Sequence, residues 1–320
     1  MKHINSLLDK LKDGIFSSTY QLQRIVILTG VALTLAVISF GGYYYYDRYY
    51  HPQPKTADVM LQQAEKALRD KPNDPNVRLN LAETYMVNKR FDEAITIADQ
   101  VMKAYPDNQR AWFVTGVANA LKGNPANAID PLKKYVDANK DSDMPGLNKS
   151  LQAATYYLGD SYLRLGQPDK AIEPLELDVK WSQTDADAMY KLGVAYSGVK
   201  KYEEAVSMFQ SATVFVPNFT EAYEGMASDF EALKDQNYAN YAHGMVAYSK
   251  KDYKTALVLL LTAVQAKPDF APVYEGLGLT YEAMGELKNA KSNYEVAIKL
   301  NPNSFTGSSG LKSVESLLKE

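Results

Sequence analysis

The 320-residue sequence contains no cysteine. Disulfide bonds, thiolate zinc sites, iron–sulfur clusters, c-type haem attachment and a lipidated N-terminal cysteine are therefore excluded. Histidine is almost as scarce, since only His3, His51 and His243 occur and they are far apart in the sequence. Because a histidine metal site needs several such side chains together, we predict no metal ion and no cofactor.

Positive charge is also limited. The net charge is −3, and because the first 46 residues contribute +2, the remainder carries −5. A general nucleic-acid binder needs a basic face. We therefore expect no nucleic-acid partner.

The common catalytic motifs are missing. The sequence has no glycine-rich phosphate loop ending in Gly-Lys-Ser/Thr, no GxSxG and no HExxH. Gly276 and Gly278 fall inside a predicted helix, where they serve packing. Acidic pairs such as Glu203 and Glu204 stand at predicted helix starts, where the helix dipole favours carboxylates. We expect no catalytic residues and no enzymatic activity.

One long apolar run is present at residues 25–46, which hold 22 uncharged residues in succession. As a helix this run spans about 33 Å, enough to cross the hydrocarbon core of a bilayer. It predicts a single transmembrane helix, followed by a short linker at 47–55. Tyrosine favours the membrane interface, and the predicted aromatic belt consists of Tyr43, Tyr44, Tyr45, Tyr46, Tyr49 and Tyr50.

Two alternatives to a membrane anchor remain open. A cleaved signal peptide would use the small residues Ser39 and Gly41 as its cleavage site, and the run could also be a buried helix of a soluble protein. For an anchor, four Lys and Arg residues precede the run and two follow it closely. The positive-inside rule then places the tail 1–24 in the cytoplasm and the rest outside it; the reverse orientation, with a cytoplasmic C-terminal part, is the alternative.

An internal repeat is the most specific signal. Six units start at residues 75, 109, 152, 186, 237 and 271. Each matches part of one pattern, which has a large residue at position 4, Leu at 7, Gly or Ala at 8, Tyr at 11, Ala at 20, a large residue at 24, Ala at 27 and Pro at 32. The last unit matches most fully, with Tyr274, Leu277, Gly278, Tyr281, Ala290, Tyr294, Ala297 and Pro302.

This pattern resembles the tetratricopeptide repeat (TPR), whose unit has 34 residues. The resemblance implies that each unit forms two antiparallel helices, A and B, and that units stack because one unit cannot bury its own apolar face. It predicts an all-α fold, a right-handed α-solenoid of helix pairs over residues 56–307 behind the transmembrane helix. Small residues at position 8 let the paired helices approach closely.

The repeat departs from regular spacing in four places. A lone helix B is predicted within 56–74. The unit at 109 is nine residues too long, and the excess falls in a polar loop that we interpret as a surface insertion or a partner contact. An extra helix at 220–236 shifts the A/B alternation, and we expect a bend or hinge there that splits the array into two blocks. Residues 308–320 predict a cap helix whose apolar stripe is Leu311, Val314, Leu317 and Leu318.

In TPR proteins, positions 2, 5, 9, 12 and 13 of helix A line the concave face. The resemblance therefore places a partner-binding groove at Met86, Phe113, Val117, Tyr156, Tyr190, Tyr238, Tyr241, Met245 and Tyr248. Family members that clamp a peptide carboxylate carry Lys and Asn at positions 5 and 9, which are absent here. An aromatic groove suits a partner helix or extended segment, although the same rings could simply pack between units.

The chain is also similar to membrane-anchored bacterial TPR proteins of the cell envelope. This resemblance implies a protein-interaction scaffold that docks or helps assemble an envelope or membrane complex. The alternative is a structural subunit that self-associates, with the tyrosines at the interface between copies.

Overall fold

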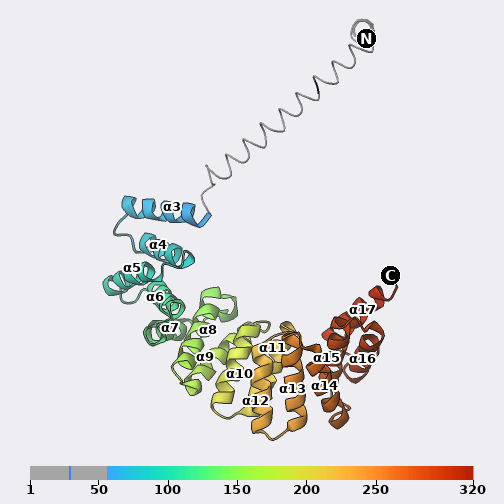
Figure 1. Ribbon diagram of the computed structural model, residues 1–320. Coiled ribbons are helices and arrows are strands. Elements are labelled where there is room, and N and C mark those ends of the chain that lie inside the picture. The colour runs from blue at the N-terminus through green and yellow to red at the C-terminus, as the bar shows by residue number, and fades with distance from the viewer. Residues whose placement is uncertain (1–28, 30–55, 320) are drawn as a thin grey trace, which may run out of the picture. The chain divides into compact units, whose positions relative to one another are not determined.

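The computed structural model describes Thr29 and residues 56–319. Residues 56–319 form fifteen α-helices and one short 3-10 helix, and they contain no strand. In chain order (Figure 1) the helices are α3 (Thr56–Asp70), α4 (Pro75–Val87), α5 (Phe91–Ala104), α6 (Gln109–Lys122), α7 (Pro125–Asn139), η1 (Pro145–Leu147), α8 (Lys149–Arg164), α9 (Pro168–Trp181), α10 (Ala186–Gly198), α11 (Tyr202–Phe215), α12 (Thr220–Ala232), α13 (Gln236–Ser249), α14 (Tyr253–Ala266), α15 (Ala271–Ala283), α16 (Leu287–Leu300) and α17 (Phe305–Leu317).

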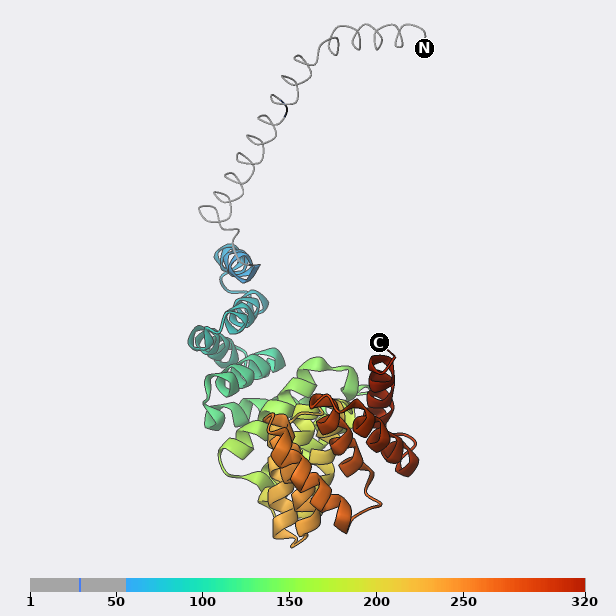
Figure 2. The ribbon, with the colours of Figure 1, turned by 45° about the vertical axis from the view of Figure 1, so that its right-hand side comes forward.

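The contacts group residues 63–319 into one compact unit. Within it each helix from α4 to α17 packs against the next one in sequence, as Figures 1 and 2 show. Helices one pair apart, such as α4 and α6 or α6 and α8, also touch. This is the stacking of a helical repeat array, so the predicted all-helical repeat fold is confirmed.

Side-chain caps define where most A helices begin. Asp74 precedes α4 and accepts a hydrogen bond from the Asn76 N–H at 2.8 Å. Asn108 accepts from the Ala111 N–H at 2.9 Å in front of α6. Such caps satisfy amide groups that have no partner inside the helix. A similar cap, Asn148, starts α8 at Lys149, ahead of the Gln152 at which the sequence unit begins.

Glycine at position 8 allows close approach to the large residue at position 24 of the same unit. A Cβ added at Gly159 would lie 2.4 Å from Leu175 Cγ, and one added at Gly278 would lie 2.4 Å from Tyr294 Cε1. Real side chains never approach so closely, so glycine is required at these positions. The same opposition recurs in the pairs Gly116 and Leu132, Gly193 and Phe209, and Gly244 and Leu260.

The extra helix α12 shifts the alternation without dividing the array. Helix α12 contacts α10, as an A helix does, and the next helix α13 contacts α15 in the same way. One apolar core cluster nevertheless continues through this region, from Ala186 to Leu277. Phe209, Tyr223 and Met226 fill it, with exposed fractions of 1%, 4% and 0%. The expected split of the array into two blocks is therefore wrong, because large side chains bridge the point where the pattern shifts.

The C-terminal helix differs from the sequence prediction. Helix α17 begins at Phe305, where the Ser304 hydroxyl accepts a hydrogen bond from the Gly307 N–H at 2.8 Å. Val314 is buried against Tyr294 and Ala290, whereas Leu317 and Leu318 are 47% and 42% exposed. The predicted apolar stripe is thus only partly covered, because α17 has no following helix within the described residues.

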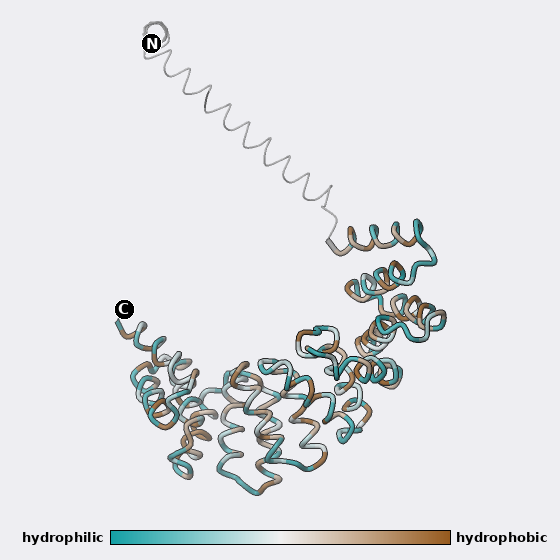
Figure 3. Tube along the Cα trace, turned by 180° about the vertical axis from the view of Figure 1, so that it is seen from behind, coloured by the Kyte–Doolittle hydropathy of each residue, from teal (hydrophilic) through white to brown (hydrophobic). Residues whose placement is uncertain are grey.

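The membrane predictions lie outside the described residues. Residues 30–46 and the proposed tyrosine belt at 43–50 are not among those the structure describes. Of the helices it does describe, none is both long and apolar enough to cross a membrane. Figure 3 shows why: along α4 to α17, hydrophobic and hydrophilic residues alternate over short intervals.

Candidate partner-binding groove

The nine predicted groove residues differ in how much surface they offer. Val117, Tyr241 and Met245 are only 6%, 5% and 2% exposed, whereas the other six are half-buried. Val117 belongs to the apolar core around Leu132 and Leu158. Val117 therefore presents little surface to a partner, because the neighbouring helices cover it, and its role as a contact residue stays a prediction. The half-buried residues are Met86, Phe113, Tyr156, Tyr190, Tyr238 and Tyr248.

Several of these rings pack against other aromatic rings. The Tyr190 ring lies 5.0 Å from that of Phe219 and 5.8 Å from that of Phe209, measured between centroids. Tyr238 stacks on Phe230 at 5.1 Å. These contacts join successive helices, so Tyr190 and Tyr238 stabilise the array in addition to any surface that they present.

A first cavity, of about 300 Å³, lies between α11, α13 and α15. Tyr241 and Met245 line it from α13 and Glu275 and Leu279 from α15. The Glu275 Oε1 atom accepts a hydrogen bond from the Ser304 hydroxyl at 2.6 Å, and burial raises the pKa of its carboxyl group. The wall contributed by α11 and the turn after it consists of Ser207, Gln210, Ser211, Thr213, Val214 and Pro217.

This first cavity lies next to the extra helix, since Tyr223 of α12 is among the residues that line it. With α12 inserted, the B helix α11 and the A helix α15 lie on opposite sides of the same space, with Tyr223 of α12 between them. At its edge the last turn of α11 exposes Val214 and Phe215 to 59% and 45%. The cavity thus combines hydroxyl and amide groups on one wall with apolar side chains on its floor and rim.

A second cavity, of about 420 Å³, lies between α8 and α10. Tyr156 and Tyr157 line it, with ring centroids 5.3 Å apart in an edge-to-face arrangement. The polar lining is Lys149, Gln152, Asp178, Asp185 and Asp187. The Gln152 amide donates to the carbonyl oxygen of Gly146 at 2.6 Å, so the insertion before α8 is tied to the cavity wall.

Asp178 is the unexpected member of this second cavity. It is 1% exposed, and its Oδ2 atom has no hydrogen-bond partner among the described residues. Burial, and secondarily the charge of Asp185, raises the pKa of its carboxyl group to about 7. Burying a carboxyl oxygen without a partner costs free energy, so Asp178 leaves a hydrogen-bond acceptor unused in the fold.

Asp178 also departs from the repeat pattern in the sequence. It occupies position 27 of the unit at 152, where the pattern requires alanine. The other five units carry apolar residues there, namely Val101, Tyr135, Ala212, Ala263 and Ala297. A single acid at a position that faces the core in every other unit marks a local departure from packing.

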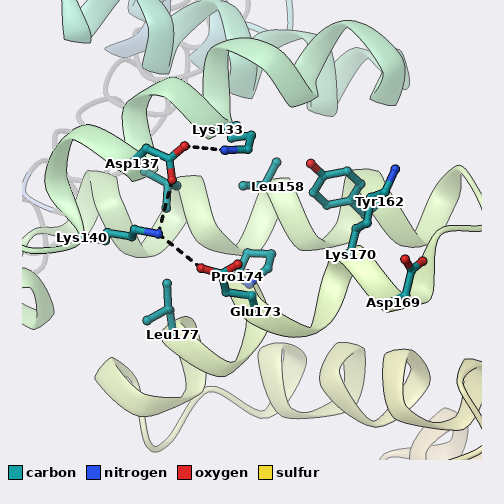
Figure 4. A pocket seen from close by; sticks show the side chains of 11 residues that line it. Lys133, Asp137, Lys140, Leu158, Tyr162, Asp169, Lys170, Glu173, Pro174 and Leu177 are labelled. Atoms are coloured by element: carbon teal, nitrogen blue, oxygen red, sulfur yellow. Dashed lines mark hydrogen bonds and ion pairs between the residues drawn. The ribbon is translucent and has the colours of Figure 1, made fainter.

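A third cavity, of about 410 Å³, lies between the B helices α7 and α9 (Figure 4). Four of its charged side chains pair with one another: Lys140 lies 3.4 Å from Asp137 and 3.3 Å from Glu173, and Lys133 pairs with Asp137 at 2.5 Å. Leu158 and Tyr162 of α8 line it between the two helices. Asp169 and Lys170, one of each sign, complete the charged lining, so the cavity has no excess of either charge.

The described side chains do not favour metal binding. Among the described residues, no three His, Cys, Asp or Glu side chains come together in a way that could hold a metal ion. The chemistry available in the cavities is therefore hydrogen bonding, ion pairing and apolar contact.

Comparison with known proteins gives three family matches. Models of the tetratricopeptide repeat match residues 53–114, residues 153–176 with 187–218, and residues 271–304. These matches cover parts of both ends and of the centre of the array.

Two curated relatives align with much of the chain. BBSome complex member BBS4 from Bos taurus is 24% identical over 241 residues, which is 69% of this chain and 44% of that protein. Hsp70-Hsp90 organizing protein from Triticum aestivum is 23% identical over 250 residues, 78% of this chain and 39% of that protein. The chain thus spans less than half the length of either relative. Among solved structures, YrrB, described as a TPR protein with an unusual peptide-binding site, has a TM-score of 0.48 at 18% identity, over 66% of this chain and 95% of that one.

Proposed function

The chain belongs to the tetratricopeptide-repeat family, whose members are protein-interaction scaffolds, and we propose that it is a membrane-anchored scaffold that docks or helps assemble an envelope or membrane protein complex. The observation that carries this proposal is the cavity between α11, α13 and α15. It contains two of the predicted groove residues, Tyr241 and Met245, as its floor.

The lining of this cavity suits an amphipathic protein segment. Tyr241, Met245 and Leu279 offer apolar surface for a partner side chain. Ser207 and Gln210 on the opposite wall offer hydrogen bonds, and the exposed Val214 extends the apolar contact beyond the rim. A helix or extended segment binds such a groove by inserting alternate or periodic apolar side chains.

The partners named for the relatives are not assigned to this chain. One relative is named as an organizer of Hsp70 and Hsp90. The basic and amide residues by which some TPR proteins clamp a peptide carboxylate are replaced here, for example by Phe113 and Val117 in the second unit. We propose that the partner is recognised through side chains along its length instead of through its C-terminal carboxylate.

Membrane anchoring rests on the sequence of residues 25–46. Their 22 uncharged residues support one transmembrane helix, and the flanking charges support a cytoplasmic N-terminus with the repeats outside. The linker at 47–55 is short, so the repeats would act close to the bilayer.

Blocking the first cavity is expected to abolish partner capture. Ser207 is exposed and lines the cavity, so Ser207→Trp places a large ring in it without disturbing the core. We expect in-cell crosslinking followed by affinity purification and mass spectrometry to recover a stoichiometric partner with the natural chain. We expect recovery to fall by about tenfold with Ser207→Trp, since a steric block removes more than ~1.4 kcal/mol of binding.

The matched control is Ser228→Trp. Ser228 is exposed on α12 and lines none of the cavities described above, so this variant should capture the partner normally. Recovery of only further copies of this chain, unchanged by Ser207→Trp, would replace the scaffold proposal by self-assembly.

Membrane attachment is tested separately. Alkaline washing of membranes from cells that make the full chain should leave it in the pellet, because a spanning helix is retained by the hydrocarbon core. A chain that is released, or that lacks its first residues when its N-terminus is sequenced, would rule out the anchor and leave the interaction proposal intact.

A further inference from the structure

The second cavity, between α8 and α10, is acidic. Its charged lining is Asp178, Asp185 and Asp187 against the single cation Lys149. Asp185 also caps α10, since its Oδ1 atom accepts from the Ala188 N–H at 3.0 Å. Asp187 is exposed at the first turn of the same helix. The acidic groups therefore come from two sides of the cavity, α9 and the start of α10.

Asp178 points to a missing positive group. Its side chain is almost fully buried and lines the cavity, while its Oδ2 atom lacks a partner among the described residues. A buried polar atom without a hydrogen bond loses its hydration and gains nothing in exchange. A donor that entered the cavity would supply that bond, and a charged donor would supply the strongest one.

The chain's own lysine does not fill this role. The Lys149 Nζ atom donates to the Gln152 Oε1 atom at 3.0 Å. Within 56–319 none of the ion pairs joins Lys149 to Asp178, Asp185 or Asp187. The raised pKa of the Asp178 carboxyl is caused by burial and by Asp185, with no lowering by a cation.

Two tyrosines make the cavity suitable for an organic cation. Tyr156 and Tyr157 meet edge to face, so they present both ring surface and hydroxyl groups to the space. Ring faces attract ammonium and guanidinium groups. The chain already uses this contact elsewhere, where the Lys267 Nζ atom lies 4.9 Å from the Tyr238 ring centroid and the Arg90 Cζ atom 4.4 Å from that of Tyr85.

We propose that the cavity between α8 and α10 binds a lysine or arginine side chain of the partner protein. The unpartnered Oδ2 atom of Asp178 accepts a hydrogen bond from the cationic head, Asp185 and Asp187 add negative charge to the lining, and Tyr156 and Tyr157 cover the aliphatic stem. A bare metal ion is a poorer occupant, because the described residues provide no group of ligands for one. The inference rests on the proposed function, since it names the chemistry by which the scaffold recognises its partner.

The test uses immobilised peptides and the purified full chain. An array of peptides of about ten residues with varied sequence carries lysine, arginine, norleucine or citrulline at one fixed position. We expect lysine or arginine peptides to bind at least about tenfold more tightly than their neutral counterparts. Asp187→Asn should reduce this preference to less than about threefold, since it removes one charge from an exposed position.

The variants separate recognition from folding. Asp178→Asn should remove the preference as well. Because this substitution alters a buried site, the decisive variant is Asp187→Asn, at an exposed position. The matched control is Asp169→Asn, an exposed aspartate of α9 that lines the third cavity instead; its preference should equal that of the natural chain.

Equal binding of charged and neutral peptides, no peptide binding at all, or a preference that survives Asp187→Asn would overturn the proposal. The scaffold proposal is judged independently, by the effect of Ser207→Trp on partner capture. A partner lost with Ser207→Trp, together with no cation preference on the array, would mean that only the cation cavity is wrong.

Discussion

Replacing Phe209 with alanine is expected to lower the free energy of unfolding by about 3–5 kcal/mol. Phe209 is 1% exposed in the core that continues through the extra helix. Its ring lies against Gly193 of α10 and Gly225 of α12, where an added Cβ would approach it to 2.6 Å on either side. Because glycine has no side chain, neither Gly193 nor Gly225 could fill the space left by the ring, and a large cavity would remain.

The comparison variant is Phe215→Ala. Phe215 lies in the same helix but is 45% exposed, so its removal should change stability by less than about 0.5 kcal/mol. Chemical denaturation of both variants of the full chain, followed by circular dichroism, gives the two values. An equal loss of unfolding free energy in both variants would show that Phe209 is not the residue that holds α10 and α12 together.

Replacing Asp178 with asparagine should stabilise the protein increasingly as the pH rises from about 4 to 7. In the folded chain the pKa of Asp178 is raised to about 7, against an ordinary value of 3.8. Between these two values the folded state holds a proton that the unfolded state has released, so folding becomes less favourable with rising pH. The difference between variant and natural chain should grow by about 1.4 kcal/mol per pH unit, on the order of 4 kcal/mol in all.

Denaturation of both proteins at several pH values measures this difference directly. Carboxyl groups elsewhere titrate alike in the two proteins and cancel. Below about pH 4 and above about pH 7 the difference should stay constant, because Asp178 then has the same charge in both states. A difference that does not change with pH would show that Asp178 has a partner or is hydrated when buried.

The repeat pattern predicted the packing of the array from few residues. The small residue at position 8 lets the paired helices approach closely, as expected, and in the structure it lies against the large residue at position 24, for example Gly278 against Tyr294. This was predictable because both positions obey the geometry of a single helix pair. The A helices α4, α6, α10 and α15 also begin at the residues where the sequence units start, namely Pro75, Gln109, Ala186 and Ala271.

Features that depend on several helices at once were not predictable in this way. Helical position places Tyr241 on the inner side of α13, but its burial follows from neighbours on two other segments, Tyr223 of α12 and Phe270 before α15. The predicted split into two blocks was wrong for the same reason. A shift in the order of A and B helices does not specify which side chains pack across it. Asp178 was overlooked because a mismatch to a repeat pattern is common, and only the structure shows that it is buried without a partner.

The most direct test of the scaffold proposal is the amount of partner crosslinked to the chain in intact cells, compared between Ser207→Trp and Ser228→Trp. The cavity between α11, α13 and α15 contains Ser207 but not Ser228. We predict a loss of about tenfold with Ser207→Trp and none with Ser228→Trp. Equal recovery from the two variants would contradict the account and place the partner on another face of the array.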